Sequence, residues 1–236
     1  MATVNSLMAR DDKRELIRKI QSACALLGSA DAELPERLLT AKGKLVNLKS
    51  AGWRPVGMIG DKGYTFGREQ ETENIDALGY ASPVRSDVTT VPRTISFTPL
   101  EKGRRHMLEL QYGVDLSGVT QDPETGEIVF DEPDLPVNAE YKLLVIGIDG
   151  PKDREWVMGK GYGAVKLQNT AEEVWGREGA VASEITLDVF PDENGVPVRH
   201  YLGGTGALAY KEVLGFEEAT ETDSDTEDQD NILGEF

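Results

Sequence analysis

The sequence predicts an all-β domain, a sandwich or barrel, with one helix packed on it. Over residues 53–202, short runs of β-branched and aromatic residues alternate with turn signals such as GDKG at 60–63. Residues 100–113 instead place apolar side chains at helical spacing and end at Gly113, a residue type that commonly terminates helices. We therefore expect a β domain over residues 51–210 with its one long helix near 102–112.

Residues 1–50 are expected to form an N-terminal arm with short helices. Two aspartates at 11 and 12 can cap a helix, and Pro35 can begin a second one. No strand pattern is recognisable before Lys44. The apolar residues that share one helical face are Leu16, Ile17, Ile20, Cys24 and Leu27.

Two further segments of the β region are distinctive. Residues 141–148, YKLLVIGI, are apolar on both faces, which predicts a central strand. In residues 184–189 apolar and polar side chains alternate, which predicts a half-buried strand, and Asn194-Gly195 after it predicts a hairpin turn. The glycine-rich stretch at 159–163 does not lie between a strand and a helix, so we interpret its glycines as sites of a turn or of close packing.

The segment 67–76, GREQETENID, carries charge on both faces of a predicted strand. Glu69, Glu71 and Glu73 share one face, and the other face is polar, so neither suits a monomer's core. Two interpretations remain open. The segment is either an edge strand whose charges deter aggregation, or a strand that lines an aqueous surface in an assembly.

Residues 76–91 are predicted to be a loop that reaches a neighbouring subunit. The segment is long for a hairpin connection, and Gly79 and Pro83 disfavour regular pairing. Exposing its apolar side chains to water is costly, whereas contact with a neighbour is favourable. The contact residues expected in this loop are Leu78, Tyr80 and Val84.

The C-terminal residues 211–236 form an acidic tail. From Glu212 to Phe236 there are ten acidic residues and no basic one, which leaves −7 of the net −17 for residues 1–211. Such a segment is expected to be disordered when alone. Its end could remain solvated or dock on a neighbouring surface, and the residues able to dock are Ile232, Leu233 and Phe236.

Composition argues against several classes of function. The single Cys24 excludes a disulfide framework and a cysteine-based zinc site, and His106 and His200 belong to no catalytic or metal-binding motif. The charge of −17 argues against tight binding to nucleic acid. The N-terminus does not resemble a signal peptide, and the longest apolar run is too short for a membrane span. We expect a soluble non-enzyme with no catalytic residues, no metal and no cofactor.

An ordered set of motifs resembles the major tail tube proteins of long-tailed, non-contractile bacteriophages. The resemblance covers roughly residues 53–202. It includes the stretch GWRPVGMIGDKGYTFGREQETENIDALGYASPVRS and then RTISFTPLEKGRRHMLELQYG. The matching motifs run from Gly57 to Gly63, from Glu73 to Gly79, at Val84-Arg85, from Thr94 to Glu101 and at Tyr112-Gly113.

The resemblance implies a β-sandwich virion protein. Six copies would form a ring, and stacked rings would form the tail tube that conducts DNA into the host. The implied partners are further copies of the chain, the tape measure, terminator and distal tail proteins, and passing DNA that is not tightly bound, with no membrane. Assembly would take place in the host cytoplasm. The N-terminal arm is longer than is usual in that family, and an acidic tail follows the tube domain.

A conduit for DNA should repel it, because like charges at close range are poorly screened by salt. The candidates for the lumen wall are Glu69, Glu71 and Glu73, with Glu184 and Asp188 as weaker ones, because strand parity places the last two only away from the core.

Two alternatives remain open. One is a soluble β-sandwich module that binds a carbohydrate or a receptor. Such a module needs an aromatic platform or a polar cleft, and the tryptophans of this chain, at 53, 156 and 175, are dispersed along the sequence. The other is a related ring-forming tail terminator or head–tail connector.

Overall fold

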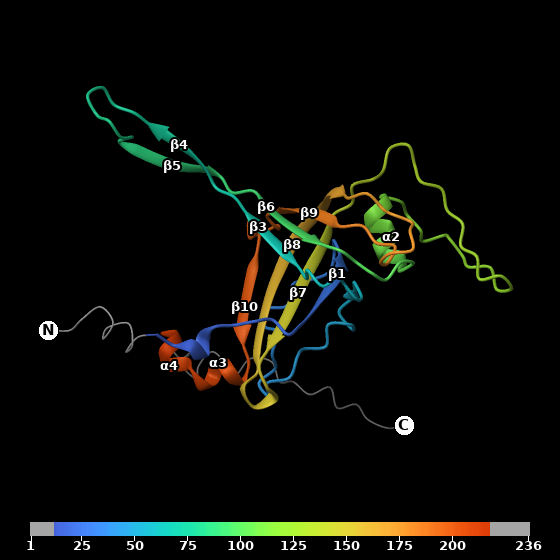
Figure 1. Cartoon of the computed structure of the whole chain (residues 1–236), viewed down its shortest axis with the longest axis horizontal. Helices are drawn as coiled ribbons and strands as arrows, with labels where there is room; N and C mark the ends of the chain where they lie inside the picture. Colours follow the sequence, from blue (N-terminus) through green and yellow to red (C-terminus); the bar gives the residue numbers. More distant parts are fainter. Residues whose placement is uncertain (1–11, 218–236) are drawn as a thin grey trace, which may run out of the picture.

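The computed structural model describes residues 12–217, and these form an antiparallel eight-stranded sheet, a separate two-stranded hairpin and a few short helices (Figure 1). The strand order is β2-β1-β7-β8-β9-β6-β3, and β10 also pairs with β8. The predicted all-β class is confirmed. The strands are β1 (Ser22–Ser29), β2 (Arg54–Pro55), β3 (Thr65–Arg68), β4 (Glu71–Ile75), β5 (Arg85–Thr90), β6 (Arg93–Phe97), β7 (Tyr141–Asp149), β8 (Trp156–Thr170), β9 (Ile185–Phe190) and β10 (Arg199–Gly203). The helices are η1 (Arg14–Leu16), α2 (Arg105–Tyr112), η2 (Lys152–Arg154), α3 (Thr205–Ala209) and α4 (Lys211–Leu214).

Strand β7 lies at the centre of the sheet, as its two apolar faces predict. It pairs with β1 along one side and with β8 along the other. Consecutive residues Leu143 and Leu144 are both fully buried, so both faces of the strand are covered. Burial on two faces is what a continuous apolar run requires.

The core consists of one apolar cluster on each face of the sheet. The first joins β1, β7 and β8 to β6, β9 and α2, and Phe66 of β3 stacks on Tyr162 of β8 with 6.4 Å between ring centroids. The half of the sheet that contains β3 therefore folds over the half that contains β8. The second cluster packs Trp53 and Leu38 against the outer face of β7.

Helix α2 is confirmed at its predicted place. Met107 and Leu110 are buried, and they cover the first cluster. The helix ends at Gly113, whose φ of 60° places it in the left-handed region and whose N–H donates to the carbonyl of Glu109 at 3.0 Å. Glycine adopts this conformation without the steric cost that a Cβ brings.

The expectation of a helical arm over residues 1–50 is wrong for Ser22–Ser29, and Pro35 begins no helix, so the β domain starts before residue 51. Residues 22–29 form β1, which pairs with β7 along its whole length, and the helix nearby, η1, has three residues. The helical spacing was coincidental, since Leu26 and Leu27 occupy opposite faces of the strand in different clusters. Long-range pairing overrides a local periodic pattern here. Residues 22–29 therefore belong to the sheet.

The turn at Asn194-Gly195 is present but does not make a hairpin between neighbouring strands. The Gly195 N–H donates to the carbonyl of Asp192, and the Asp192 N–H donates to the carbonyl of Val196. The flanking strands both pair with the same edge of β8, since Phe190 lies opposite Ala164 and Arg199 opposite Gly161. The prediction of a hairpin is wrong. Strands β9 and β10 run in the same direction along one edge of β8, and residues 191–198 form a loop between them instead of a chain reversal.

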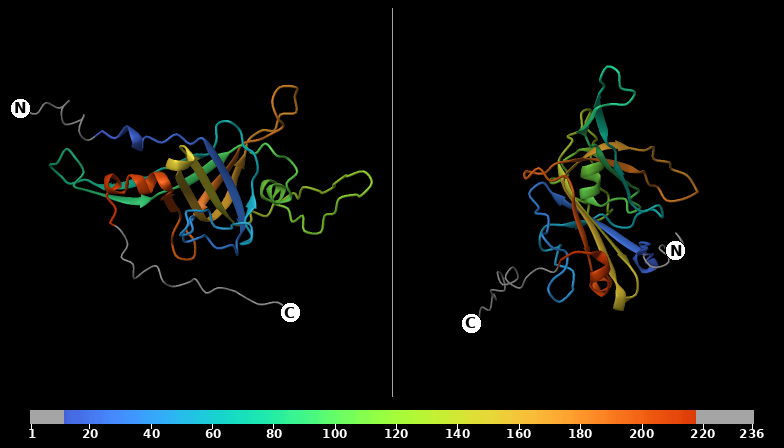
Figure 2. Two further views of the ribbon diagram at one scale, coloured as in Figure 1. Left: turned by 90° about the horizontal axis from the view of Figure 1, so that it is seen from below. Right: turned by 90° about the vertical axis from the view of Figure 1, so that its left-hand side faces the viewer.

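The molecule is elongated, and its extensions gather at its two ends (Figure 2). The β4–β5 hairpin, η1 and α4 lie toward one end, and α2 with the segment 113–140 lies toward the other. In the described range, no helix has the length and apolar character needed to cross a membrane. Most of the predicted acidic tail lies outside the described residues.

Replacing Leu187 with alanine should destabilise the subunit by about 2–5 kcal/mol, because this side chain is fully buried in the first cluster. The matched control is Leu78→Ala, which changes a side chain that is fully exposed in the subunit. Its free energy of unfolding should change by less than about 0.5 kcal/mol. Urea unfolding of the two variants measures both values, and equal effects would contradict the assignment of the core.

Candidate assembly surfaces

The β4–β5 hairpin continues the β3–β6 ribbon beyond the body of the sheet (Figure 1). Arg68 pairs with Arg93 and Glu71 pairs with Thr90, so the register is unchanged across the interruption. The Glu69 N–H donates to the carbonyl of Pro92 between them. Every residue of β4 and β5 is exposed. The hairpin is thus one long arm of the sheet without a packed face in the subunit.

The two faces of this hairpin differ in charge. Glu71, Glu73 and Asp87 lie on one face, where Asp87 pairs with Arg85 at 2.6 Å. The Thr90 hydroxyl donates to the Glu71 carboxylate at 2.6 Å. The other face is uncharged, and a bulge at Thr89 adjusts β5 so that this alternation continues along both strands. The residues of the uncharged face are Thr72, Asn74, Ser86 and Val88.

The acidic face is continuous with the polar face of the sheet. Thr65 of β3 lies opposite Ser96 of β6, which lies opposite Thr186 of β9, and the last two hydroxyls hydrogen-bond at 3.0 Å. Because side chains alternate along each strand, Glu69, Glu71 and Glu73 fall on the same side as Thr65. Glu184 and Asp188 share the side of Thr186. Strand alternation therefore places all five predicted carboxylates on one face of the ribbon.

Asp188 has close neighbours on that face, unlike the hairpin carboxylates farther out. The Gln168 amide donates to its carboxylate at 2.8 Å, and Lys166 lies opposite it in the ladder. Glu184 extends the same edge, because its carbonyl accepts the Ala171 N–H at 2.8 Å. The Lys166 ammonium pairs with Glu140 at 3.5 Å, so Asp188 has a hydrogen-bond partner but no ion pair among the described residues, whereas Glu184 is exposed.

The tip of the hairpin exposes the predicted contact residues. Leu78 is fully exposed, and Tyr80 and Val84 are largely exposed. The predicted loop over 76–91 is wrong in part, because residues 85–90 form β5 and pair with β4. Gly79 and Pro83 disfavour pairing only within the tip, which spans 76–84. The other predicted contact residues, Ile232, Leu233 and Phe236, lie outside the described residues.

Exposed apolar side chains also occur on segments that the sequence reading did not single out. They lie in two long connections, 113–140 and 171–184, in α3, and just after α4. An ion pair between Lys102 and Glu173 holds the second connection near α2. The sequence signal that could have identified these segments is the presence of apolar residues inside otherwise polar loops. The most exposed of these side chains are Val129, Leu135, Val137, Val174, Trp175, Leu208 and Phe216.

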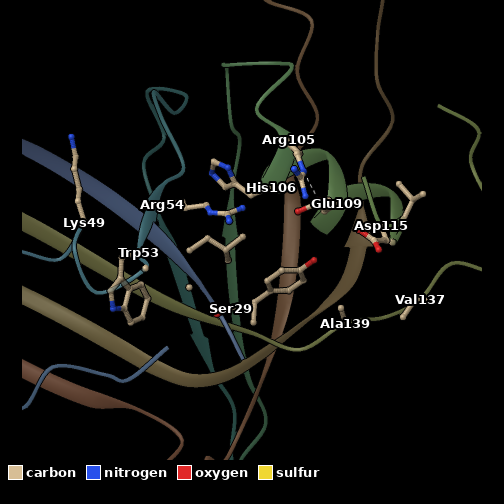
Figure 3. Close-up of a pocket in the computed structure, with 16 residues that line it drawn as sticks. Ser29, Lys49, Trp53, Arg54, Arg105, His106, Glu109, Asp115, Val137 and Ala139 are labelled. Carbon is tan, nitrogen blue, oxygen red and sulfur yellow. Dashed lines mark hydrogen bonds and ion pairs between the residues drawn. The ribbon is translucent and has the colours of Figure 1, made fainter. Parts of the chain in front are cut away.

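A cavity of about 640 Å³ lies between α2, β2 and the paired ends of β1 and β7 (Figure 3). Lys49, Arg54, Arg105 and His106 bring basic groups to it from three separate segments. Figure 3 shows the Arg54 side chain between the strands and the first turn of α2. The sequence assigns His106 to no catalytic or metal-binding motif, and no local motif reveals this cluster.

Some charged groups that line the cavity have partners in the subunit, and others have none among the described residues. Arg105 pairs with Glu109 at 2.8 Å. The Ser117 N–H donates to Asp115 at 2.8 Å, and this hydrogen bond lowers the pKa of that carboxyl. Within residues 12–217, Lys49 and Arg54 have neither an ion pair nor a side-chain hydrogen bond. With three cations and two carboxylates in its lining, the described part of the cavity keeps a net charge of about +1, and neither Lys49 nor Arg54 is in an ion pair.

His106 fixes α2 to β2. Its Nε2–H donates to the carbonyl of Pro55 at 2.9 Å. Burial lowers the pKa of His106 below its ordinary value of 6.5, and the charges of Arg54 and Arg104 lower it further. The ring is consequently neutral near pH 7.

Asp149 ties the N-terminal segment to the opposite end of the sheet. Its carboxylate pairs with Arg18 at 3.3 Å and accepts the Lys19 N–H at 3.1 Å. The Arg18 guanidinium also lies over the Trp156 ring, 4.8 Å from its centroid. The segment before β1 is therefore held against the β7–β8 turn.

Among residues 12–217, no group of three His, Cys, Asp or Glu side chains could hold a metal ion. Cys24 is exposed at the free edge of β1, and His200 is exposed on β10. The features that remain are surfaces suited to contact with other molecules.

A comparison with solved structures finds 27 matching chains, and two of them are described below. No family model and no curated protein matches the sequence. The tail of an empty GTA particle, computed with helical refinement in C6 symmetry, is 11% identical over 61% of this chain and 86% of that chain, with a TM-score of 0.30. The SPP1 tail tube is 12% identical over 89% of this chain and 94% of that chain, with a TM-score of 0.35. At these TM-scores neither match establishes a shared function.

In the isolated subunit the backbone amides of β4 and β5 should exchange with deuterium quickly, because a two-stranded hairpin without a packed face is marginally stable. On assembly their exchange should slow by on the order of 100-fold or more. Hydrogen–deuterium exchange mass spectrometry measures both states, and β7 serves as a control that is protected in each. Protection of the hairpin in the free subunit equal to that of β7 would contradict this interpretation.

The lowered pKa of His106 predicts a contribution to the pH dependence of stability. Below about pH 6.5 the unfolded chain binds a proton that the folded chain resists, so folding stability falls as the pH falls. His106→Gln retains a hydrogen-bond donor but does not titrate. Thermal unfolding between pH 7.5 and 5.5 should therefore show a smaller loss in the variant than in the wild type. An equal loss of thermal stability in the variant and the wild type would show that His106 does not contribute to the pH dependence.

Proposed function

We propose that this chain is the structural subunit of a bacteriophage tail tube, assembled as stacked hexameric rings that conduct DNA into the host. The observation that carries the proposal is the β4–β5 hairpin, a long arm with both faces exposed and an apolar tip. A soluble monomer gains nothing from such an arm. A subunit of a larger assembly can bury it against its neighbours.

The energetics of the tip support this role. Burying Leu78, Tyr80 and Val84 against a neighbouring copy would contribute about 1.5–3 kcal/mol for each side chain. The uncharged face of the hairpin, with Thr72 and Val88, offers side chains that pack well on a β surface. The ordered motifs over residues 53–202 support the specific assignment to tail tubes.

The acidic face of the ribbon fits the wall of a conduit. Glu69, Glu71 and Glu73 are the candidates that line the lumen, with Glu184 and Asp188 as extensions of the same face. Negative charge there repels phosphates over distances shorter than the Debye length, about 8 Å at physiological salt. The DNA can then move along the tube without being held.

The proposed setting follows from this role. The chain would act in the virion as part of the phage tail, after assembly in the host cytoplasm. Its partners would be further copies, the tape measure, terminator and distal tail proteins, and DNA in transit. Tail subunits of this kind act by assembly and not by catalysis.

Electron microscopy of the purified full chain tests the proposal. Tubes of stacked rings are the expected result. Single rings that do not stack would favour a terminator or connector instead, and monomers at all concentrations would favour a binding module. Leu78→Ser with Tyr80→Ser should leave the subunit folded and reduce tube formation at least tenfold by sedimentation. Undiminished assembly of that variant would remove the tip from the interface.

The position of the acidic face is tested by a cryo-EM map of the tube and by charge reversal. Glu71→Lys with Glu73→Lys should give tubes that bind DNA at least tenfold more tightly at about 50 mM salt, because each added cation releases counterions from DNA. The control is Glu132→Lys with Glu178→Lys, a pair of exposed carboxylates on other segments. The lining assignment fails if the map places all five carboxylates outside the lumen, or if the two pairs behave alike.

A further inference from the structure

The cavity of Figure 3 combines the size and the charge needed to hold an acidic peptide. It encloses about 640 Å³, and Lys49 and Arg54 stand at it without an anionic partner among the described residues. Both side chains are exposed and can be approached from outside. Lysine and arginine recognise carboxylates through charge-assisted hydrogen bonds, and arginine can form two in parallel.

The other polar groups of the cavity cancel only part of this charge. Glu109 is paired with Arg105, and Asp115 accepts the Ser117 N–H but remains a carboxylate, so three cations face two anions in the lining. The His106 ring already donates to Pro55. The first turn of α2 contains no acidic residue, so the positive end of the helix adds to the field of the basic side chains. An anion that enters the cavity therefore meets two cations without a partner among the described residues, and one carboxylate, that of Asp115.

The described chain ends at the opposite end of the molecule from this cavity. Ser29 and Tyr141 line the cavity at one end of the β1–β7 pair. At the other end of β7, α3 joins the β7–β8 turn, since the Gly206 N–H donates to the carbonyl of Glu155. Eight residues of strand separate the two ends by about 26 Å. Figures 1 and 2 show α2 and α4 toward opposite ends of the molecule.

The chain that follows α4 is complementary to the cavity in charge. Residues 217–236 contain nine carboxylates and no lysine or arginine. Twenty residues can span at most about 70 Å when extended, which is more than enough to reach a neighbouring molecule. A head-to-tail stack along the long axis of the subunit would bring the α4 end of one copy to the cavity end of the next.

We propose that the cavity formed by α2, β2 and the ends of β1 and β7 binds the acidic C-terminal segment, residues 217–236, of a second copy of this chain. The inference rests on the proposed stacking and names a contact that would join successive rings. Lys49 and Arg54 supply the charges that recognise the segment. The partner segment brings its carboxylates, so the contact weakens as salt increases.

Carbodiimide crosslinking of assembled full-length protein tests this contact. The reagent joins the Lys49 ammonium group to a nearby carboxylate as an amide, with loss of water. Particles are assembled from equal amounts of unlabelled and ¹⁵N-labelled chain, and the crosslinked peptides are identified by mass spectrometry. We expect crosslinks between Lys49 and residues 217–235, about half of them joining a labelled to an unlabelled peptide, as random mixing of copies requires.

Two variants make the test specific. Arg54→Glu retains Lys49 as the reporter and should reduce these crosslinks at least tenfold. The control Arg177→Glu reverses an exposed charge in another segment and should leave them unchanged. Crosslinks between peptides of the same label alone would show that the segment binds its own copy and would overturn the proposal. Tubes without Lys49 crosslinks would also overturn it, whereas the absence of tubes would overturn the proposed function.

Discussion

The fold depends on close packing against one face of strand β8, where three alternate residues, Gly159, Gly161 and Gly163, are glycines. Strand β8 pairs with β7, β9 and β10 and so joins the two halves of the sheet. A Cβ at Gly159 or Gly161 would collide with Leu38 or Leu34, and one at Gly163 would overlap Asp192. Larger residues at these positions would force Leu38, Leu34 or Asp192 to move, so the glycines allow the segment after β1 and the turn after β9 to pack closely on β8. The glycine-rich stretch is thus a packing surface, as its position away from any helix suggests.

The sequence predicts the parts of this fold in which one local pattern dominates. Strand β7 is apolar on both faces, β9 alternates, and α2 combines helical spacing with a terminating glycine, so each has one plausible structure. Strand β1 could not be predicted in this way, because small residues such as Ala25 and Gly28 fit a strand only once β7 and Trp53 are beside them. The Asn194-Gly195 turn was recognised, but its role depends on which edge of β8 the flanking strands meet.

The same distinction applies to the candidate surfaces. Alternation along a single segment identifies the acidic triad at 69–73, because parity needs only the sequence. The relation of that triad to Asp188 requires the pairing of β3 with β6 and of β6 with β9, which lie far apart in the chain. The basic cavity is still less accessible to sequence reasoning. Its cations come from residues 49, 54 and 105, and only the fold brings them together.

Lys49 and Arg54 mark one end of the subunit with a local group of cations. They lie beside α2, and neither has an anionic partner among the described residues, whereas α4 lies toward the opposite end. The α2 end is not basic as a whole, because the segment 113–140 brings eight carboxylates and no lysine or arginine to it. Net charge therefore does not order the copies, and the order depends on which segment fills the cavity. If the segment after α4 of one copy fills the cavity of the next, the contact is heterologous, and such contacts propagate as an open stack instead of closing as a dimer.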